Sequence, residues 1–327
     1  MILALETSCD DTCAAVVDRD GAIRSNVISS QGIHDRYGGV VPEIAARHHL
    51  ELTDPAVAAA LDDAGIGLDD VELVAVTQGP GLVGALLVGL AEAKAIAAVR
   101  GLPLVPVDHL QGHVAANFVA PDPFEPPFVC LIASGGHTLL ARVTDHEGFE
   151  ALGATLDDAA GEAFDKGARM LGLPYPGGPA LSKLAEGGDA GAHAFPTADG
   201  VAGLDFSFAG LKTALLYTLR DRGDAGEPSD ADLAASYQRA IVDQLVARTE
   251  RALEQSGLGR LAIGGGVAAN ALLRERVAAL GATVHVPPPE LCTDNAAMIA
   301  SAARFAVPLP PGAYLELDAY ATGERGL

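Results

Sequence analysis

The stretch LPLVPVDHLQGH, residues 102–113, contains the pattern that decides the fold class of this chain. Its apolar first half is typical of a buried strand, and Asp108 can cap a following helix, with Gln111 reaching back as in a capping box. His109 and His113, four residues apart, would then share one face of that helix. The positive end of the helix dipole disfavours a protonated His109, and a metal needs a neutral imidazole. The stretch therefore predicts a strand that leads into a helix with two candidate metal ligands.

Other interpretations of these histidines are open at this point. The same spacing fits two polar histidines on a partly exposed helix, since spacing is only one requirement of coordination. A zinc peptidase needs Glu directly after the first His as general base, and Leu110 occupies that position. The adjacent His48 and His49 cannot share one helix face, so we interpret them as surface or interaction residues and not as a metal site.

Strand, glycine turn and helix recur along the chain, which indicates parallel strands. The apolar run 71–77 leads into a glycine-rich turn and a small-residue helix, and the strand at 102–107 follows. This order is that of a βαβ unit and predicts an α/β protein. A later strand feeds the turn at 264–270, whose Gly-x-Gly-x-x-Ala also fits a dinucleotide fingerprint. That turn lies late in the chain and lacks the context of a first βα unit, which disfavours NAD binding.

A second repeated layout predicts an internal duplication. A strand, a polar tip and a second strand open the chain at residues 2–17, and the layout recurs at residues 128–143. The second tip, at 134–138, offers backbone N–H groups without Cβ atoms and suits an anion. The proline-rich segment 122–127 is typical of a domain junction.

Composition limits the classes of function. The chain has 327 residues and a net charge of −22, which excludes a stand-alone basic nucleic-acid binder. An RNA substrate would need a local basic patch or a basic partner. Its 4 cysteines form no CxxC pair, as expected of reduced thiols in a cytosolic protein. We find no signal-peptide pattern and no membrane-spanning apolar run, so we expect a cytoplasmic protein without membrane contact.

Nine motifs in order along the chain resemble those of the TsaD/Kae family, in its bacterial branch. That family makes the N6-threonylcarbamoyl modification of adenosine in tRNA. The motifs begin at Glu6 (ETSCDDT), Gly38 (GGVVPE), Gln78 (QGPGL), Asp108 (DHLQGH), Ser134 (SGGHT), Gly161 (GEAFDK), Leu204 (LDFSFAGLK), Gly265 (GGVAAN) and Cys292 (CTDNAAM). The resemblance spans nearly the whole chain.

The resemblance implies an α/β fold of the actin/hexokinase-like (ASKHA) class, with two duplicated lobes and a central cleft. We expect an N-terminal lobe at 1–118, a C-terminal lobe at 119–295, and a C-terminal helix at 296–327 that packs back on the N-terminal lobe.

The resemblance also implies the site residues. His109, His113 and Asp294 match the family's ligands for one divalent metal per chain, which the family suggests is iron(II), with zinc(II) or magnesium(II) as alternatives. Asp11 matches the proposed acid/base carboxylate, where many relatives carry the longer Glu. The nucleotide or acyl-adenylate contacts match Ile132, Ala133, Ser134, Gly135, Gly136, Asp165, Gly178 and Asn270.

The function implied is transfer of threonylcarbamoyl from threonylcarbamoyl-AMP to N6 of adenosine 37 in tRNAs that read ANN codons, which makes the chain an acyltransferase. The tRNA is expected to bind through a complex with TsaB-like and TsaE-like subunits. Two alternatives stay open, a glycoprotein metalloendopeptidase, after an older family name, and a non-catalytic nucleotide-binding scaffold.

Overall fold

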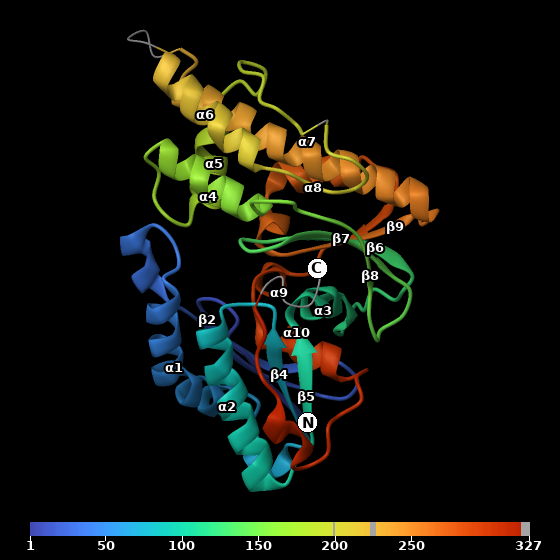
Figure 1. Cartoon of the computed structure of the whole chain (residues 1–327). Helices are drawn as coiled ribbons and strands as arrows, with labels where there is room; N and C mark the ends of the chain where they lie inside the picture. The colour runs from blue at the N-terminus through green and yellow to red at the C-terminus, as the bar shows by residue number, and fades with distance from the viewer. Residues whose placement is uncertain (199, 223–226, 322–327) are drawn as a thin grey trace. The chain divides into compact units, whose positions relative to one another are not determined.

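The computed structural model describes residues 1–198, 200–222 and 227–321. They form two compact units, each built around its own sheet (Figure 1). Unit 1 comprises the described residues of Met1–Pro126, Thr144–Phe149 and Pro287–Leu327, and unit 2 those of Pro127–Val143 and Glu150–Val286. Among these described residues, no helix is both long and apolar enough to cross a membrane.

The sheet of unit 1 has five strands in the order β3-β2-β1-β4-β5. They are β1 (Ile2–Glu6), β2 (Asp11–Val17), β3 (Ile23–Ser30), β4 (Leu73–Gly79) and β5 (Leu104–Asp108). The first three strands pair antiparallel as a meander, while β4 pairs parallel with β1 and with β5. The parallel part is the βαβ arrangement that the repeated strand, turn and helix predicted.

Helices cover both faces of this sheet. The α-helices are α1 (Pro42–Asp63), α2 (Val83–Arg100), α3 (His109–Ala115), α9 (Pro289–Cys292) and α10 (Ala296–Ala303), and the 3₁₀ helices are η1 (Gly32–Tyr37), η2 (Leu68–Asp70), η3 (Ala116–Phe118) and η5 (Ala313–Glu316). Helices α1 and α2 pack against each other, and α10 packs against α3 and β1.

The alternation of side chains along β1 directs its polar end away from the apolar core. Leu3 and Leu5 belong to a buried cluster with Leu90 of α2. Because successive strand residues point to opposite faces, Glu6 points to the other face, toward α3. Thr77 of β4 points the same way, since its neighbour Val76 lies in the apolar cluster and pairs with Leu5.

The sheet of unit 2 repeats the arrangement of unit 1. Its order is β10-β9-β6-β7-β8, with β6 antiparallel to β7, β7 antiparallel to β8, and β6 and β9 in a parallel pair. The strands are β6 (Phe128–Ala133), β7 (Thr138–Val143), β8 (Glu150–Ala154), β9 (Arg260–Gly264) and β10 (Thr283–His285). Counted outward from the first strand of each unit, the two orders are the same, which confirms the predicted duplication.

Helices of unit 2 include one long amphipathic element. They are α4 (Ala160–Met170), α5 (Gly177–Ala185), α6 (Ala209–Asp221), α7 (Asp230–Ser256) and α8 (Ala271–Ala278), with the 3₁₀ helix η4 (Gly266–Ala269). Ser229 and Asp232 form a reciprocal capping box at the start of α7, and Gly257, at φ 67°, ends it. Helices α5 and α8 pack against α7.

The segment 287–295 lies in unit 1, whereas the expected lobes placed it with the C-terminal half. Two contacts attach the segment and the start of α10 to strands β2 and β3. Cys13 Sγ donates to the carbonyl of Asp294 at 3.6 Å, and Ala297 N donates to Asn26 Oδ1 at 3.3 Å. Asp294 is therefore part of the same unit as α3.

Candidate metal centre

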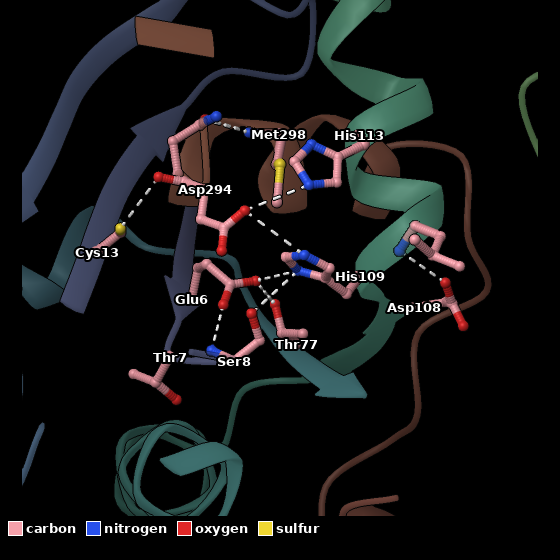
Figure 2. A network of polar contacts seen from close by, with 12 residues as sticks. Glu6, Thr7, Ser8, Cys13, Thr77, Asp108, His109, His113, Asp294 and Met298 are labelled. Carbon is pink, nitrogen blue, oxygen red and sulfur yellow. Dashed lines mark hydrogen bonds and ion pairs between the residues drawn. The ribbon is translucent and has the colours of Figure 1, made fainter. Parts of the chain in front are cut away.

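Three side chains of unit 1 converge in the structure (Figure 2). His109 and His113 come from α3, and Asp294 comes from the turn before α10. Their potential ligand atoms all lie within 4.8 Å of one another. Asp294 Oδ1 is 3.3 Å from His113 Nε2 and 3.6 Å from His109 Nε2. Two imidazoles and one carboxylate form a donor set that suits a divalent transition metal, so the structure contains a possible metal-binding site.

Helix α3 begins at His109 because Asp108 caps it. Asp108 Oδ1 accepts hydrogen bonds from Leu110 N at 2.8 Å and Gln111 N at 3.2 Å, as predicted. The prediction that the Gln111 side chain reaches back to complete a capping box is wrong. Its Nε2 instead donates to the carbonyl of His146 at 3.3 Å, so a single side chain makes this cap.

His113 supports the fit of a metal to this site. Its side chain is fully buried, and within the described part of the chain the only polar contact of either ring nitrogen is the 3.3 Å approach of Nε2 to Asp294 Oδ1, which does not meet hydrogen-bond geometry. A buried polar nitrogen without a hydrogen bond is costly, and a metal shared by Nε2 and the Asp294 carboxylate would relieve that cost. The ring meets that of His109 edge to face, with centroids 4.7 Å apart, so both Nε2 atoms can approach one ion.

The buried carboxylate of Glu6 contacts His109 at Nδ1, the ring nitrogen that does not face Asp294. Its Nδ1 lies 3.0 Å from Glu6 Oε2 and 3.2 Å from Ser8 Oγ. Burial alone would lower the pKa of His109, but the charges of Asp294 and Glu6 outweigh it and raise this pKa to about 9. Burial alone would raise the pKa of Glu6, but the positive charge of His109 and the hydrogen bond from it keep this pKa below its ordinary value.

Glu6 receives two further hydrogen bonds. Thr77 Oγ1 donates to its Oε2 at 2.5 Å, and the backbone N–H of Ser8 donates to its Oε1. Within the motif at 6–12 only Asp11 was singled out from the sequence, so this role of Glu6 was missed. The available signal was the alternation along β1, which directs Glu6 away from the apolar cluster of Leu3 and Leu5.

Asp11, the expected acid/base residue, opens β2 opposite Ser30. Burial raises the pKa of Asp11 from 3.8 to about 6, against the opposing effect of a hydrogen bond from Ser30. The negative charges of Asp294 and Asp10 act in the same direction as burial. A carboxylate with a pKa near neutrality can take up a proton under physiological conditions.

His49 fixes the hairpin that carries Asp11. The interpretation of His49 as a surface residue is wrong, because its side chain is fully buried on α1. Its Nδ1 lies 2.8 Å from Thr12 Oγ1, and its Nε2 lies 3.0 Å from the carbonyl of Cys9. Burial holds the pKa of His49 below its ordinary value, which favours the neutral ring.

The second polar tip lies in unit 2. Ile132 and Ala133 end β6, and the turn that follows is closed by a bond from Ser134 N to the carbonyl of His137 at 2.8 Å. At Gly135 and Gly136 an added Cβ would meet no atom within 4 Å, so the backbone of this turn has open space beside it. These five expected contact residues, 132–136, are thus contiguous at the end of one strand.

Asp165, Gly178 and Asn270 also lie in unit 2. Asp165 Oδ1 accepts from Gly177 N at 2.8 Å and from Gly178 N at 3.2 Å, which fixes the start of α5. Asn270 Oδ1 caps α8 by accepting from Leu273 N at 3.0 Å. Its Nδ2 donates to Gln238 Oε1 at 2.8 Å and to Ser182 Oγ at 3.0 Å, so both ends of the Asn270 amide have partners within the unit.

The duplicated units define an actin/hexokinase-like α/β protein, and two solved structures share this fold. Component A of (R)-2-hydroxyglutaryl-CoA dehydratase from Acidaminococcus fermentans aligns with a TM-score of 0.57 at 15% identity, over 93% of this chain and 96% of that one. HypF from T. kodakarensis aligns with a TM-score of 0.61 at 15% identity, over 92% of this chain and 46% of that one. At such identities the likeness shows the fold alone.

Sequence comparison shows the family. The family model TsaD, tRNA N6-adenosine threonylcarbamoyltransferase, matches residues 22–301. A protein of that name from Symbiobacterium thermophilum is 52% identical over 310 residues, which cover 93% of this chain and 91% of the relative. Another from Pelobacter propionicus is 49% identical over 331 residues, 98% of this chain and 96% of the relative. The chain therefore belongs to the TsaD family, which confirms the family membership that the nine motifs indicated.

Proposed function

We propose that this chain is an acyltransferase that moves threonylcarbamoyl from threonylcarbamoyl-AMP to N6 of adenosine 37 in tRNAs that read ANN codons. The observation that carries the proposal is the convergence of His109, His113 and Asp294 in a chain of the TsaD family. In the reaction, N6 forms a bond to the carbamoyl carbon. The bond from that carbon to the phosphate oxygen breaks, and AMP leaves.

The proposed ligands are His109 Nε2, His113 Nε2 and a carboxylate oxygen of Asp294. The two-imidazole, one-carboxylate set permits iron(II) or zinc(II), and we propose iron(II) because the family suggests it. Zinc(II) and magnesium(II) are the alternative outcomes of metal analysis. When bound, the metal supplies a Lewis acid for the carbonyl or the leaving phosphate oxygen. That help matters because the lone pair of the exocyclic amine is delocalised into the adenine ring.

The chain's own groups would manage the proton and the nucleotide. Asp11, with its pKa raised to about 6, would accept the proton that N6 loses during attack. The backbone N–H groups of the turn Ser134–Gly136 would bind the phosphate, since no Cβ atom covers the two glycines. Ile132, Ala133, Asp165, Gly178 and Asn270 complete the proposed nucleotide contacts.

Partner subunits would help to present the tRNA. The net charge of −22 disfavours tight binding of a polyanion by this chain alone. We propose that TsaB-like and TsaE-like proteins supply part of the tRNA-binding surface. Tight binding of tRNA by the isolated chain that is insensitive to salt would contradict this proposal.

Reconstitution tests the proposed activity. The metal-loaded chain is mixed with threonylcarbamoyl-AMP, the two partner proteins and an unmodified tRNA that reads ANN codons, and the digested nucleosides are analysed by mass spectrometry. We expect threonylcarbamoyladenosine, and none from a control transcript with guanosine at position 37. A fully assembled mixture that leaves adenosine 37 unmodified would refute the proposal and favour a binding scaffold.

The peptidase alternative is not favoured. The general base of such an enzyme would follow His109, and that position holds Leu110, an apolar side chain that is buried. Glu6 lies next to the ligands, but it is fully buried and its oxygens accept from Thr77 and Ser8.

A further inference from the structure

We propose that Glu6 is a positioning residue that holds the proton of His109 on Nδ1 and so directs Nε2 toward Asp294. The inference rests on the proposed function, because it concerns the metal ligand set named there. It assigns Glu6 a role that acts through His109. The role is to determine which nitrogen of His109 binds the metal.

The hydrogen bonds around Glu6 indicate that it accepts a hydrogen bond from His109 Nδ1. Its side chain is fully buried and lies 3.0 Å from His109 Nδ1. The backbone N–H of Ser8 can only donate, and it donates to Oε1, while Thr77 donates to Oε2. Hydrogen bonds donated to both oxygens favour the ionised carboxylate, which can only accept. The group that meets it at Nδ1 of His109 is therefore an N–H donor.

The position of the proton on the His109 ring determines which nitrogen can bind a metal. In the neutral ring that binds a metal, a proton on Nδ1 leaves the lone pair on Nε2. That atom lies 3.6 Å from Asp294 Oδ1, on the side where His113 Nε2 also approaches (Figure 2). Glu6 and a metal would then bind opposite nitrogens of the same ring, and a carboxylate partner of this kind fixes ring orientation and strengthens the ligand.

Ser8 offers a competing partner, and the competition makes the inference testable. Its Oγ lies 3.2 Å from the same Nδ1. If that hydroxyl donated to Nδ1, the proton of a neutral ring would sit on Nε2 and block the metal. Glu6 is closer and bears a charge, which favours donation from Nδ1 to the carboxylate. His113 lacks any such support among the described residues, so the effect of Glu6 falls on His109 alone.

Zinc affinity tests the role of Glu6 without tRNA or acyl-adenylate. Zinc(II) alone is titrated against a chromophoric chelator with the full chain and the variants Glu6→Gln, Ser8→Ala and Glu51→Gln. Glu6→Gln keeps the shape but removes the charge, and we expect a loss of affinity of roughly 10- to 100-fold. Glu51 is exposed on α1, and the matched change there should have no effect. Unchanged affinity in a folded Glu6→Gln variant, or a larger loss in Ser8→Ala, would overturn the proposal.

Nitrogen-15 NMR of the zinc-loaded wild-type chain gives a second readout that does not depend on whether Glu6→Gln folds. We expect the His109 signals to show zinc on Nε2 and a proton on Nδ1 that is strongly shifted downfield by the carboxylate. Zinc on Nδ1 would refute the inference. Because neither measurement needs catalysis, absence of tRNA modification with these results intact would contradict only the proposed function.

Discussion

Replacing Asp11 by Asn should stabilise the chain at neutral pH and have little effect in acid. The folded protein holds the pKa of Asp11 at about 6, whereas 3.8 is its ordinary value. Between these values the folded state binds more protons than the unfolded state, so the free energy of unfolding falls as pH rises. Above pH 6 the ionised carboxylate costs the folded state about 3 kcal/mol, at roughly 1.4 kcal/mol for each tenfold change in proton affinity. Below pH 3.8 both states are protonated and the cost disappears.

Urea unfolding of the metal-free chain, followed by circular dichroism at several pH values, measures this cost. The stabilisation by Asp11→Asn should grow from near zero at about pH 4 to about 3 kcal/mol at about pH 7.5. Asp63→Asn, at the exposed end of α1, is the control for removal of an acidic charge. The same variant of Asp11 should also transfer more slowly, because an amide cannot accept the proton. A stabilisation that is equal at both pH values would refute the burial argument.

Three further predictions concern helix α3, which carries the two histidine ligands, and the residues Asp294, Asp108 and Tyr320 around it. Zinc at about 100 times its dissociation constant should raise the free energy of unfolding by about 3 kcal/mol in the wild-type chain but not in Asp294→Ala, as measured by urea unfolding. Asp108→Ala removes the cap of α3 and should cost about 1 kcal/mol of stability and weaken zinc binding, whereas unchanged zinc affinity would show that His109 is placed without the cap. Tyr320→Phe removes a hydroxyl that donates to Asp108 Oδ2 at 2.6 Å, and we expect a loss of about 1 kcal/mol, which an unaltered urea midpoint would contradict.

Local patterns predicted much of the fold. The apolar runs around polar tips became the β1–β2 and β6–β7 pairs, and the strand before Asp108 became β5. These features follow from neighbouring residues, because strand alternation and helix capping act over a few positions. The duplication was visible as a repeated layout, and the equal strand orders of the two sheets bear it out.

Contacts between distant segments were harder to predict. The spacing of His109 and His113 marked them as candidate ligands, but Asp294 came only from the family resemblance, since no local rule places it beside α3. The inward face of α1 was misjudged at His49. Ala45, His49, Thr53 and Ala56 are all buried, and their spacing of three or four residues was the signal that the His pair obscured.

A paired measurement on the same samples tests the proposed role of His109, His113 and Asp294 most directly. Bound metal is counted by mass spectrometry, and threonylcarbamoyladenosine is measured after reaction, for the wild-type chain, His109→Ala and Asp294→Ala. We expect the wild-type chain to hold one metal and modify its tRNA, and both variants to lose metal and transfer together. Full transfer by a folded variant with no bound metal would contradict the proposed metal centre.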